Sequence, residues 1–277
     1  MTATAKDLKV LMIGNSFSMC VLQHMPSVAK DMNLRLDISS LYIGGCSLEK
    51  HWSNVLKASD AGFKPYRFTR NCEGRISRSK ANICEVLSSD KWDVVTLQQA
   101  SHYSWKKESY HPYGDDLVAK IRELAPSAKI YVQETWSYTP WDKRLKTWGI
   151  DQNEMFAKLH EAYRDFASRH NLEIIRMGSA IQQWRKRLPV EYAENSLGGD
   201  VVGGGRQETR DQFKRTHDNK WVPNCDVFHL GREGEYFQAL VWTAKIFGVD
   251  VEKCKYRPDF VSQKNCALMK QIASELR

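Results

Sequence analysis

Residues 10–18 read Val-Leu-Met-Ile-Gly-Asn-Ser-Phe-Ser, an apolar run that ends abruptly in Gly14-Asn15-Ser16. A short, continuously apolar run is typical of an interior strand in a parallel sheet, and Gly-Asn-Ser is typical of a tight turn. The stretch therefore predicts a strand that presents the hydroxyl of Ser16 at the carboxyl-terminal edge of a sheet. In open α/β sheets, ligands bind at this edge.

Strand and helix patterns alternate along the rest of the chain. Further strands are predicted at 35–43, 92–97, 129–135 and 172–177, and residues 60–80 suggest a hairpin or an excursion. Helices are predicted from the first turn at Pro26 to Asn33, over 48–59 with Trp52, Val55 and Leu56 on one face, and over 82–88, 117–124, 156–166, 236–247 and 262–276. The order predicts an α/β fold, a single three-layer α/β/α domain over residues 1–277 with a central parallel sheet.

The polar, glycine-rich segment 188–223 interrupts this alternation. We expect it to form a long surface loop over the active site rather than a linker between domains.

The composition is that of an ordinary globular protein, with 42% hydrophobic and 27% charged residues among 277. No apolar run approaches the roughly 18 to 20 residues of a membrane span, and the N-terminus lacks the apolar region of a signal peptide. The chain as written is expected to be cytoplasmic, or secreted or periplasmic if a signal was removed, without membrane association. The oligomeric state is left open.

The formal net charge of +8 comes from basic residues scattered among acidic ones. No basic stripe or reader motif accompanies them, so we expect a solvated basic surface and no nucleic-acid partner. A basic-surface interaction protein stays open as an alternative.

The chain has seven cysteines, an odd number, and none is spaced Cys-x-x-Cys. Neither a zinc site nor a complete disulfide framework is expected, although a Cys72–Cys84 bridge stays open. His102 and His111 fall near the predicted edge of the sheet without a third ligand, so no metal site is predicted.

Asp226 and His229 lie three residues apart, just before the helix predicted at 236–247. A serine hydroxyl needs a general base to become a nucleophile, and a carboxylate beside histidine holds the ring in the correct tautomer. The two residues are therefore candidates for the base and its orienting acid. Alternatively, Asp226 caps the helix and His229 is a bystander.

Acyl transfer also requires hydrogen-bond donors for the developing oxyanion. The backbone amide of Ser16 is one candidate, and that of Gly45 is a second, because glycine allows close approach of backbone to a ligand. The side-chain amide of Gln98 or Gln99, after the strand predicted at 92–97, is a third.

Together these blocks resemble the SGNH (GDSL-type) hydrolase superfamily. The resemblance rests on Gly14-Asn15-Ser16, on the glycine after the second strand, and on Asp226-x-x-His229-Leu230 followed by Gly234 and Tyr236. Residues 92–101 and 135–138 further resemble a poorly characterised bacterial subgroup. Membership implies a flavodoxin-like fold, no cofactor, and esterase, lipase or deacetylase activity.

By this resemblance Ser16 is the nucleophile, His229 the base and Asp226 its orienter, with Gly45 and the Ser16 amide in the oxyanion hole. Asn15 stands where many members have aspartate, and the usual Gly-x-Asn-Asp block is absent after the third strand. Gln98 is the expected replacement donor. The rival donors are Gln99, Ser101 and His102, and the expected substrate contacts are Asn15, Gln99, Ser101 and Trp136.

The predicted function is removal of acetyl or other short acyl groups from a carbohydrate or small-molecule ester. A non-catalytic relative that binds a glycan or acyl ligand is the alternative. Aromatic residues after the third and fourth strands either stack on sugar rings or pack in the core: Trp105, Tyr110, Trp136, Tyr138 and Trp141.

Overall fold

The structure is a computed structural model that describes residues 7–188, 200–203, 213–215, 221–223 and 226–277. The strands are β1 (Asp7–Gly14), β2 (Arg35–Tyr42), β3 (Tyr66–Cys72), β4 (Arg75–Ala81), β5 (Val94–Leu97), β6 (Lys129–Gln133), β7 (Glu173–Ile175), β8 (Phe213–Arg215) and β9 (Trp221–Pro223). The helices are α1 (Ser16–Met19), α2 (Val21–Asp31), α3 (Leu48–Leu56), α4 (Ile83–Ser88), α5 (Tyr113–Leu124), α6 (Lys143–Trp148), α7 (Gln152–His170), α8 (Met177–Lys186), α10 (Arg232–Phe247) and α11 (Gln263–Glu275), with 3₁₀ turns η1 (Lys107–Tyr110) and η2 (Val251–Lys253).

The main sheet has seven strands in the order β4-β3-β2-β1-β5-β6-β7. Strand β1 lies inside it and pairs in parallel with β2 and β5, while β6 and β7 continue the parallel part. Residues 10–13 are buried on both faces of the sheet, which explains their unbroken apolar character. The predicted α/β fold with a central parallel sheet is confirmed.

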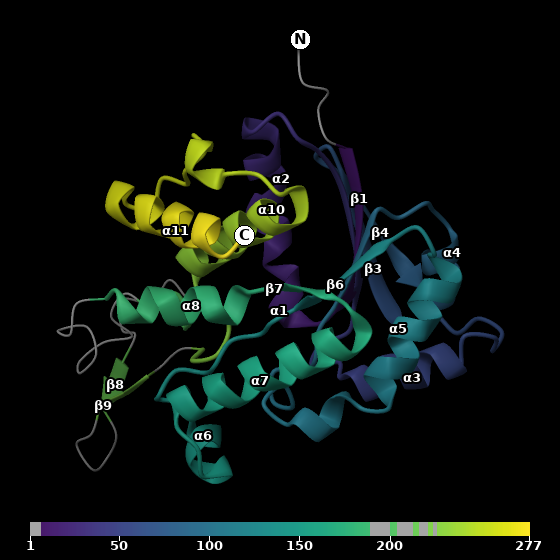
Figure 1. The fold of residues 1–277 in the computed structure, drawn as a ribbon, viewed down its shortest axis with the longest axis horizontal. Coiled ribbons are helices and arrows are strands. Elements are labelled where there is room, and N and C mark those ends of the chain that lie inside the picture. Colours follow the sequence, from purple (N-terminus) through teal and green to yellow (C-terminus); the bar gives the residue numbers. More distant parts are fainter. Residues whose placement is uncertain (1–6, 189–199, 204–212, 216–220, 224–225) are drawn as a thin grey trace.

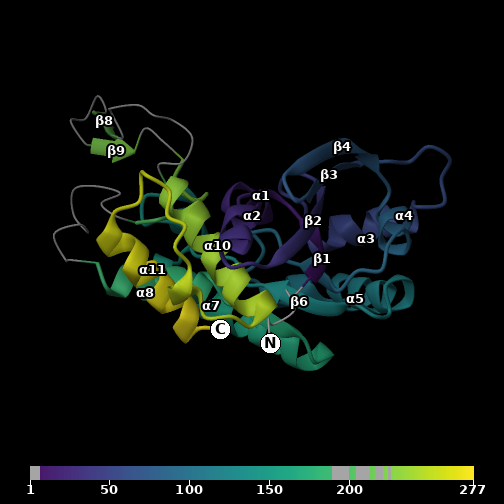
Figure 2. The same ribbon diagram turned by 90° about the horizontal axis from the view of Figure 1, so that it is seen from above.

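Helices cover both faces of the sheet (Figures 1 and 2). Helices α2, α8, α10 and α11 form one layer, in which α10 packs against α2 and α11. Helices α3, α4, α5 and α7 cover the other face, where α3 packs against α5. This is the predicted three-layer arrangement.

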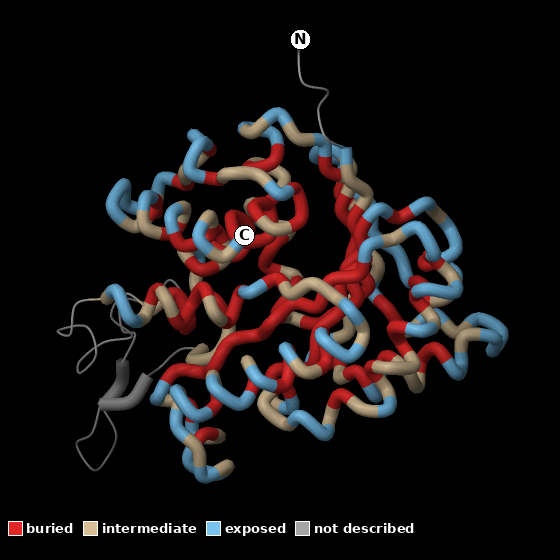
Figure 3. Tube along the Cα trace, in the orientation of Figure 1, coloured by how far each residue is buried: buried red, intermediate tan, exposed pale blue. Residues whose placement is uncertain are grey.

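Helix α10 is the centre of its layer. Its sequence suggests an amphipathic helix, but twelve of its residues are buried, including Tyr236, Gln238 and Trp242. The reason is that α2, α8 and α11 surround it, and a helix that is enclosed in this way has no solvent face. Figure 3 shows this buried helix and the buried strands as one continuous interior.

Residues 60–80 form an antiparallel hairpin, β3–β4, that extends the sheet beyond β2. Two predicted details are wrong. Helix α2 begins at Val21, so Pro26 lies inside it rather than in its first turn. Leu56 is exposed rather than on the packed face of α3. Helices α6 and α8 were not predicted. Most of the expected loop at 188–223 lies outside the described residues.

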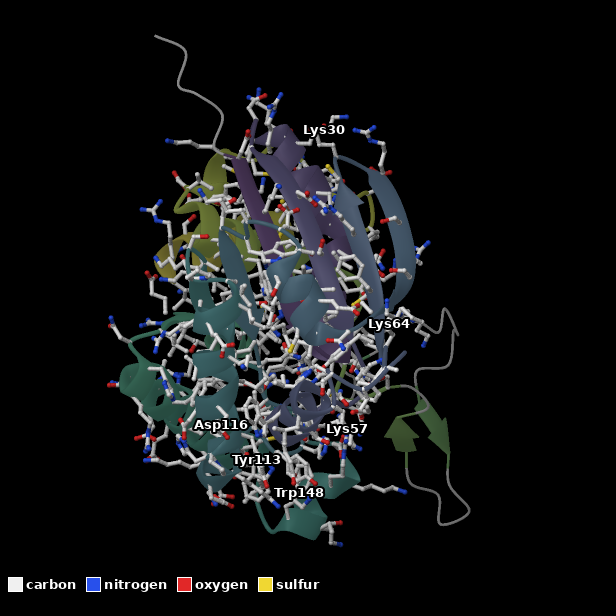
Figure 4. All side chains as sticks on the ribbon, turned by 90° about the vertical axis from the view of Figure 1, so that its right-hand side faces the viewer. Lys30, Lys57, Lys64, Tyr113, Asp116 and Trp148 are labelled. Carbon is white, nitrogen blue, oxygen red and sulfur yellow. The ribbon has the colours of Figure 1, made fainter. Side chains whose placement is uncertain are left out.

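The carboxyl ends of parallel strands lie at one edge of the sheet, and the helices that lead into the next strand end at the opposite edge. Helix α2 leads into β2, whereas α6 follows β6. Figure 4 accordingly shows Lys30, in the last turn of α2, and Trp148, at the end of α6, at opposite ends of the molecule. The segments that follow β1, β2, β5 and β6 therefore gather at the same edge.

Candidate active site

Ser16 begins the short helix α1 directly after β1. Asn15 caps this helix, since its side-chain oxygen accepts a 3.0 Å hydrogen bond from the amide of Phe17. The turn also requires a glycine before the asparagine: a Cβ on Gly14 would lie 2.4 Å from the hydroxyl of Ser18. The sharp turn leaves the side chain of Ser16 at the edge of the sheet.

His229 and Asp226 reach this serine from the segment before α10. Nε2 of His229 lies 2.8 Å from the Ser16 hydroxyl, and Nδ1 of the same ring lies 2.5 Å from Oδ2 of Asp226. The structure thus brings the three predicted residues together in the order hydroxyl, imidazole, carboxylate. This geometry allows the ring to take the serine proton while the carboxylate stabilises the imidazolium.

The segment from Asp226 to His229 is a tight turn around the carboxylate. Oδ1 of Asp226 accepts hydrogen bonds from the backbone amides of Phe228 at 2.9 Å and His229 at 2.8 Å. Burial raises the pKa of Asp226, but these bonds and the bond to the His229 ring outweigh it, so the pKa lies below its ordinary value. The carboxylate is therefore ionised at neutral pH, as the orienting role requires.

The turn is tied to the segment that follows β6. The indole Nε1 of Trp136 donates a 2.8 Å hydrogen bond to the carbonyl of Phe228, and the hydroxyl of Thr139 donates one of 2.9 Å to Val227. The Trp136 ring is fully buried and stacks on Phe17, with ring centroids 4.2 Å apart. Trp136 therefore contacts the backbone of Phe228, next to His229, and the ring of Phe17 inside the protein, which corrects its expected role as a substrate contact.

Gln98 lies beneath the Ser16 turn and does not face the Ser16 hydroxyl. Its side-chain nitrogen donates a 2.6 Å hydrogen bond to Oδ1 of Asn15, and its oxygen accepts one of 2.6 Å from Gln133. Gln133 and Gln238 both donate to the carbonyl of Phe17, at 3.0 and 2.8 Å. All four amides are buried, so they form one network beneath the Ser16 turn.

This network corrects the prediction that Gln98 donates to the oxyanion, because its amide is bonded inside the protein and does not line the cleft described below. Asn15 is likewise buried, with its side-chain nitrogen on the carbonyl of Cys46. Neither residue offers its side chain to a substrate.

The remaining expected substrate contacts are structural as well. The oxygen of the Gln99 side chain accepts from the amide of Leu48, and the Ser101 hydroxyl lies 2.8 Å from that of Tyr138. Gln99 and Ser101 are buried, as are Tyr110 and Tyr138. Aromatic residues after β5 and β6 therefore include core residues, and the sugar-stacking interpretation is wrong for Tyr110, Trp136 and Tyr138.

A cleft of about 780 Å³ opens at Ser16 and His229. Its walls combine four parts of the chain: the α1–α2 segment, the end of β2, the β3–β4 hairpin, and the segment that leads into α10. The lining residues are Ser16, Met19, Cys20, Leu22, Gln23, Tyr42, Gly44, Arg67, Thr69, Asn71, Ile76, Arg78, Asp226, His229, Leu230 and Glu235. The contribution of the hairpin was missed, although the alternation of Arg67, Thr69 and Asn71 is a signal for one face of a strand.

The turn after β2 borders this cleft through Gly44. Gly45 follows with φ 61°, in the left-handed region that favours glycine, and the position its Cβ would take is open. Among the described residues, no group of three or more His, Cys, Asp or Glu side chains is placed to hold a metal ion. The thiols of Cys72 and Cys84 are free, without a bridge between them.

Residues 9–198 match the family described as a domain of unknown function, DUF4886. The chain belongs to this family. A crystal structure of a DUF4886 protein from Bacteroides uniformis is 26% identical, with a TM-score of 0.80 over 98% of this chain and 94% of that chain. No curated protein sequence matches the chain.

More distant structures share the fold. A protein from Slackia heliotrinireducens assigned to the SGNH hydrolases is 16% identical, with a TM-score of 0.53 over 87% of this chain and 100% of that one. An acetylxylan esterase from Geobacillus stearothermophilus is 11% identical, with a TM-score of 0.51 over 89% and 97%. The predicted SGNH-type fold is confirmed.

None of the helices in the described part of the chain is long and apolar enough to span a membrane.

Proposed function

We propose that this protein is a serine ester hydrolase that removes acetyl or other short acyl groups from a carbohydrate. The observation that carries the proposal is the hydrogen-bonded series from the Ser16 hydroxyl through the His229 ring to Asp226, with distances of 2.8 and 2.5 Å. A hydroxyl, an imidazole and an ionised carboxylate in this order form a nucleophile with its base and orienting acid.

The reaction has two halves. In the first, the Ser16 oxygen attacks the ester carbonyl while His229 accepts its proton, and collapse of the tetrahedral intermediate breaks the bond to the alcohol oxygen. His229 then gives the proton to the leaving alkoxide. In the second half, a water molecule that His229 deprotonates attacks the acyl-serine ester, and the carboxylic acid leaves as Ser16 regains its proton.

Negative charge that develops on the carbonyl oxygen needs donors at the start of α1 and at the turn after β2. We assign this role to the backbone amide of Ser16, which lines the cleft, and to that of Gly45, which directly follows the lining residue Gly44. Two backbone donors are the arrangement in other serine hydrolases, and one donor is worth roughly 10² to 10³ in kcat. Gln98 contributes by holding Asn15 and the turn in place.

The carbohydrate part of the proposal has two supports. The cleft is lined by polar side chains, including Gln23, Thr69 and Asn71, which suit a hydroxyl-rich alcohol better than a long acyl chain. In addition, an acetylxylan esterase is among the structures that share this fold. The acyl group is proposed to be short.

One specific observation favours a second candidate, a non-catalytic relative that binds a glycan or an acyl ligand. The side-chain amide that would complete the oxyanion hole is absent from the cleft, because Gln98 is bonded to Asn15 and Gln133. Such a relative would bind ligand in the cleft with Ser16 unreactive.

A fluorophosphonate probe and hydrolysis of p-nitrophenyl acetate separate the two candidates. The wild-type protein should be labelled at Ser16 and should hydrolyse the ester, whereas Ser16→Ala and His229→Ala should fall to background. The exposed Ser127, replaced by alanine, is the control for loss of a hydroxyl and should leave both signals unchanged. A wild-type rate equal to that of both site variants, without labelling, contradicts the hydrolase.

A further inference from the structure

The β3–β4 hairpin presents one of its two faces to the cleft. Successive residues of a strand point to opposite sides, and directly paired residues share a side. The register pairs Arg67 with Lys80, Thr69 with Arg78 and Asn71 with Ile76. Apart from Lys80, each of these residues lines the cleft, so this face forms its outer wall.

The register also places this wall relative to the nucleophile. Gly14 at the end of β1 pairs with Tyr42 of β2, which pairs with Arg67 of β3. Two strand spacings of about 4.8 Å put the backbone of Arg67 about 10 Å from that of Gly14, two residues before Ser16. That separation leaves room for a sugar-sized group between the serine and the hairpin.

The basic residues of the hairpin differ in their partners. Arg70 points to the face away from the cleft, where it forms ion pairs with Asp37 and Asp90. In the part of the chain that the structure describes, no carboxylate forms an ion pair with Arg67 or Arg78, and both side chains are exposed. Two guanidinium groups in the wall of the cleft thus retain their capacity to bind an anion.

The position of Arg67 is defined by the neighbouring strand. Its guanidinium lies 4.2 Å from the centre of the Tyr42 ring, so the ring stacks on it and leaves its edge for hydrogen bonds. Of the carboxylates that line the cleft, Asp226 is hydrogen-bonded to His229.

We propose that Arg67 and Arg78 form an anion subsite, and that the substrate is an acyl ester whose alcohol part is an acidic sugar. The anionic group, a carboxylate in a uronic acid or a sulfate ester, would bind at the hairpin while the acyl group lies at Ser16. A planar guanidinium matches both groups by paired hydrogen bonds. The inference rests on the proposed esterase function and adds the charge of its substrate.

Basic residues on an edge strand also have a simpler use, because they discourage pairing with other chains. Arg75 serves that purpose equally well, but it pairs with Cys72 and faces away from the cleft. Replacement of Arg75 by glutamine removes one positive charge from the same hairpin, as each of the substitutions Arg67→Gln and Arg78→Gln does, and is therefore the control for the loss of an arginine outside the cleft.

The test compares acetylated methyl glucuronide with acetylated methyl glucuronamide, which has a neutral amide in place of the carboxylate, and measures release of acetate. The wild-type protein should show a kcat/KM about tenfold or more higher for the acid, as a charged hydrogen bond predicts. Arg67→Gln with Arg78→Gln should abolish this preference, whereas Arg75→Gln should keep it. An acetylated methyl glucoside 6-sulfate distinguishes a sulfate from a carboxylate preference.

Hydrolysis of p-nitrophenyl acetate reports the esterase function independently of the subsite. Equal rates for the acid, the sulfate and the amide, or a preference that survives the double substitution, would overturn the anion subsite while leaving the esterase intact. If neither sugar ester is hydrolysed, thermal protection by methyl glucuronide decides: protection that Arg67→Gln and Arg78→Gln remove supports the subsite, and its absence in wild type overturns it.

Discussion

The side-chain nitrogen of Gln98 donates a 2.6 Å hydrogen bond to Oδ1 of Asn15, the oxygen that also caps α1, the helix that begins at Ser16. This bond joins the segment after β5 to the turn after β1, and both residues are buried. An amide that is buried and bonded in this way positions the backbone of the turn. The family resemblance suggested instead a donor to the substrate.

Replacement of Gln98 by methionine, which is similar in size but has no amide, tests this positioning role. The substitution removes one buried hydrogen bond from Asn15 and one from Gln133, so the free energy of unfolding should fall by about 1–3 kcal/mol. Urea denaturation measures this change in the free energy of unfolding. A stable variant whose kcat falls by roughly 10² or more would instead favour a direct donor to the oxyanion.

Asp226→Asn tests the orienting acid. The amide of asparagine can donate to Nδ1 of His229 and so favours the tautomer that cannot accept the serine proton. We expect kcat for p-nitrophenyl acetate to fall by roughly 10⁴ with little change in KM. A loss of less than about tenfold would show that His229 does not depend on this carboxylate.

The same carboxylate makes stability depend on pH. Hydrogen bonds hold the pKa of Asp226 in the folded protein below its ordinary value of 3.8. The stability that the ionised carboxylate of Asp226 contributes is therefore fully present at a pH above its ordinary pKa. It is lost as the pH falls through the lower pKa of the folded protein. Urea denaturation of wild type and Asp226→Asn, from about pH 6 to about pH 2.5, should show a difference between them that shrinks below about pH 4. A constant difference over this range argues against the depressed pKa.

Gly14→Ala tests the tightness of the nucleophile turn. The new Cβ would lie 2.4 Å from the Ser18 hydroxyl, so we expect a loss of about 1–3 kcal/mol in the free energy of unfolding. Because the clash is with a side-chain oxygen, Ser18→Ala in the same chain should restore part of the loss. A double-mutant cycle of unfolding measurements gives the coupling, and additive effects would mean that the turn accommodates the methyl group elsewhere.

The sequence alone predicted the order of strands and helices along the chain, the SGNH-type fold, and Ser16, Asp226 and His229 as the candidate site residues. These features rest on local patterns that burial imposes: β1 is apolar because both faces of an interior parallel strand are covered. The spacing of Asp226 and His229 is also local, because one tight turn brings the carboxylate to the ring. Because the motifs follow one another in the same order as in the SGNH superfamily, the sequence also connected this turn to Ser16.

Only the tertiary structure decided what surrounds the triad. Whether a polar side chain after a strand faces a substrate or the interior depends on neighbours from other elements, and Gln98, Gln99 and Ser101 all turn inward to partners far along the chain. The role of the hairpin was hidden for the same reason. Arg67 and Arg78 resemble any exposed basic residues until the register of β2, β3 and β4 places them across the cleft from Ser16.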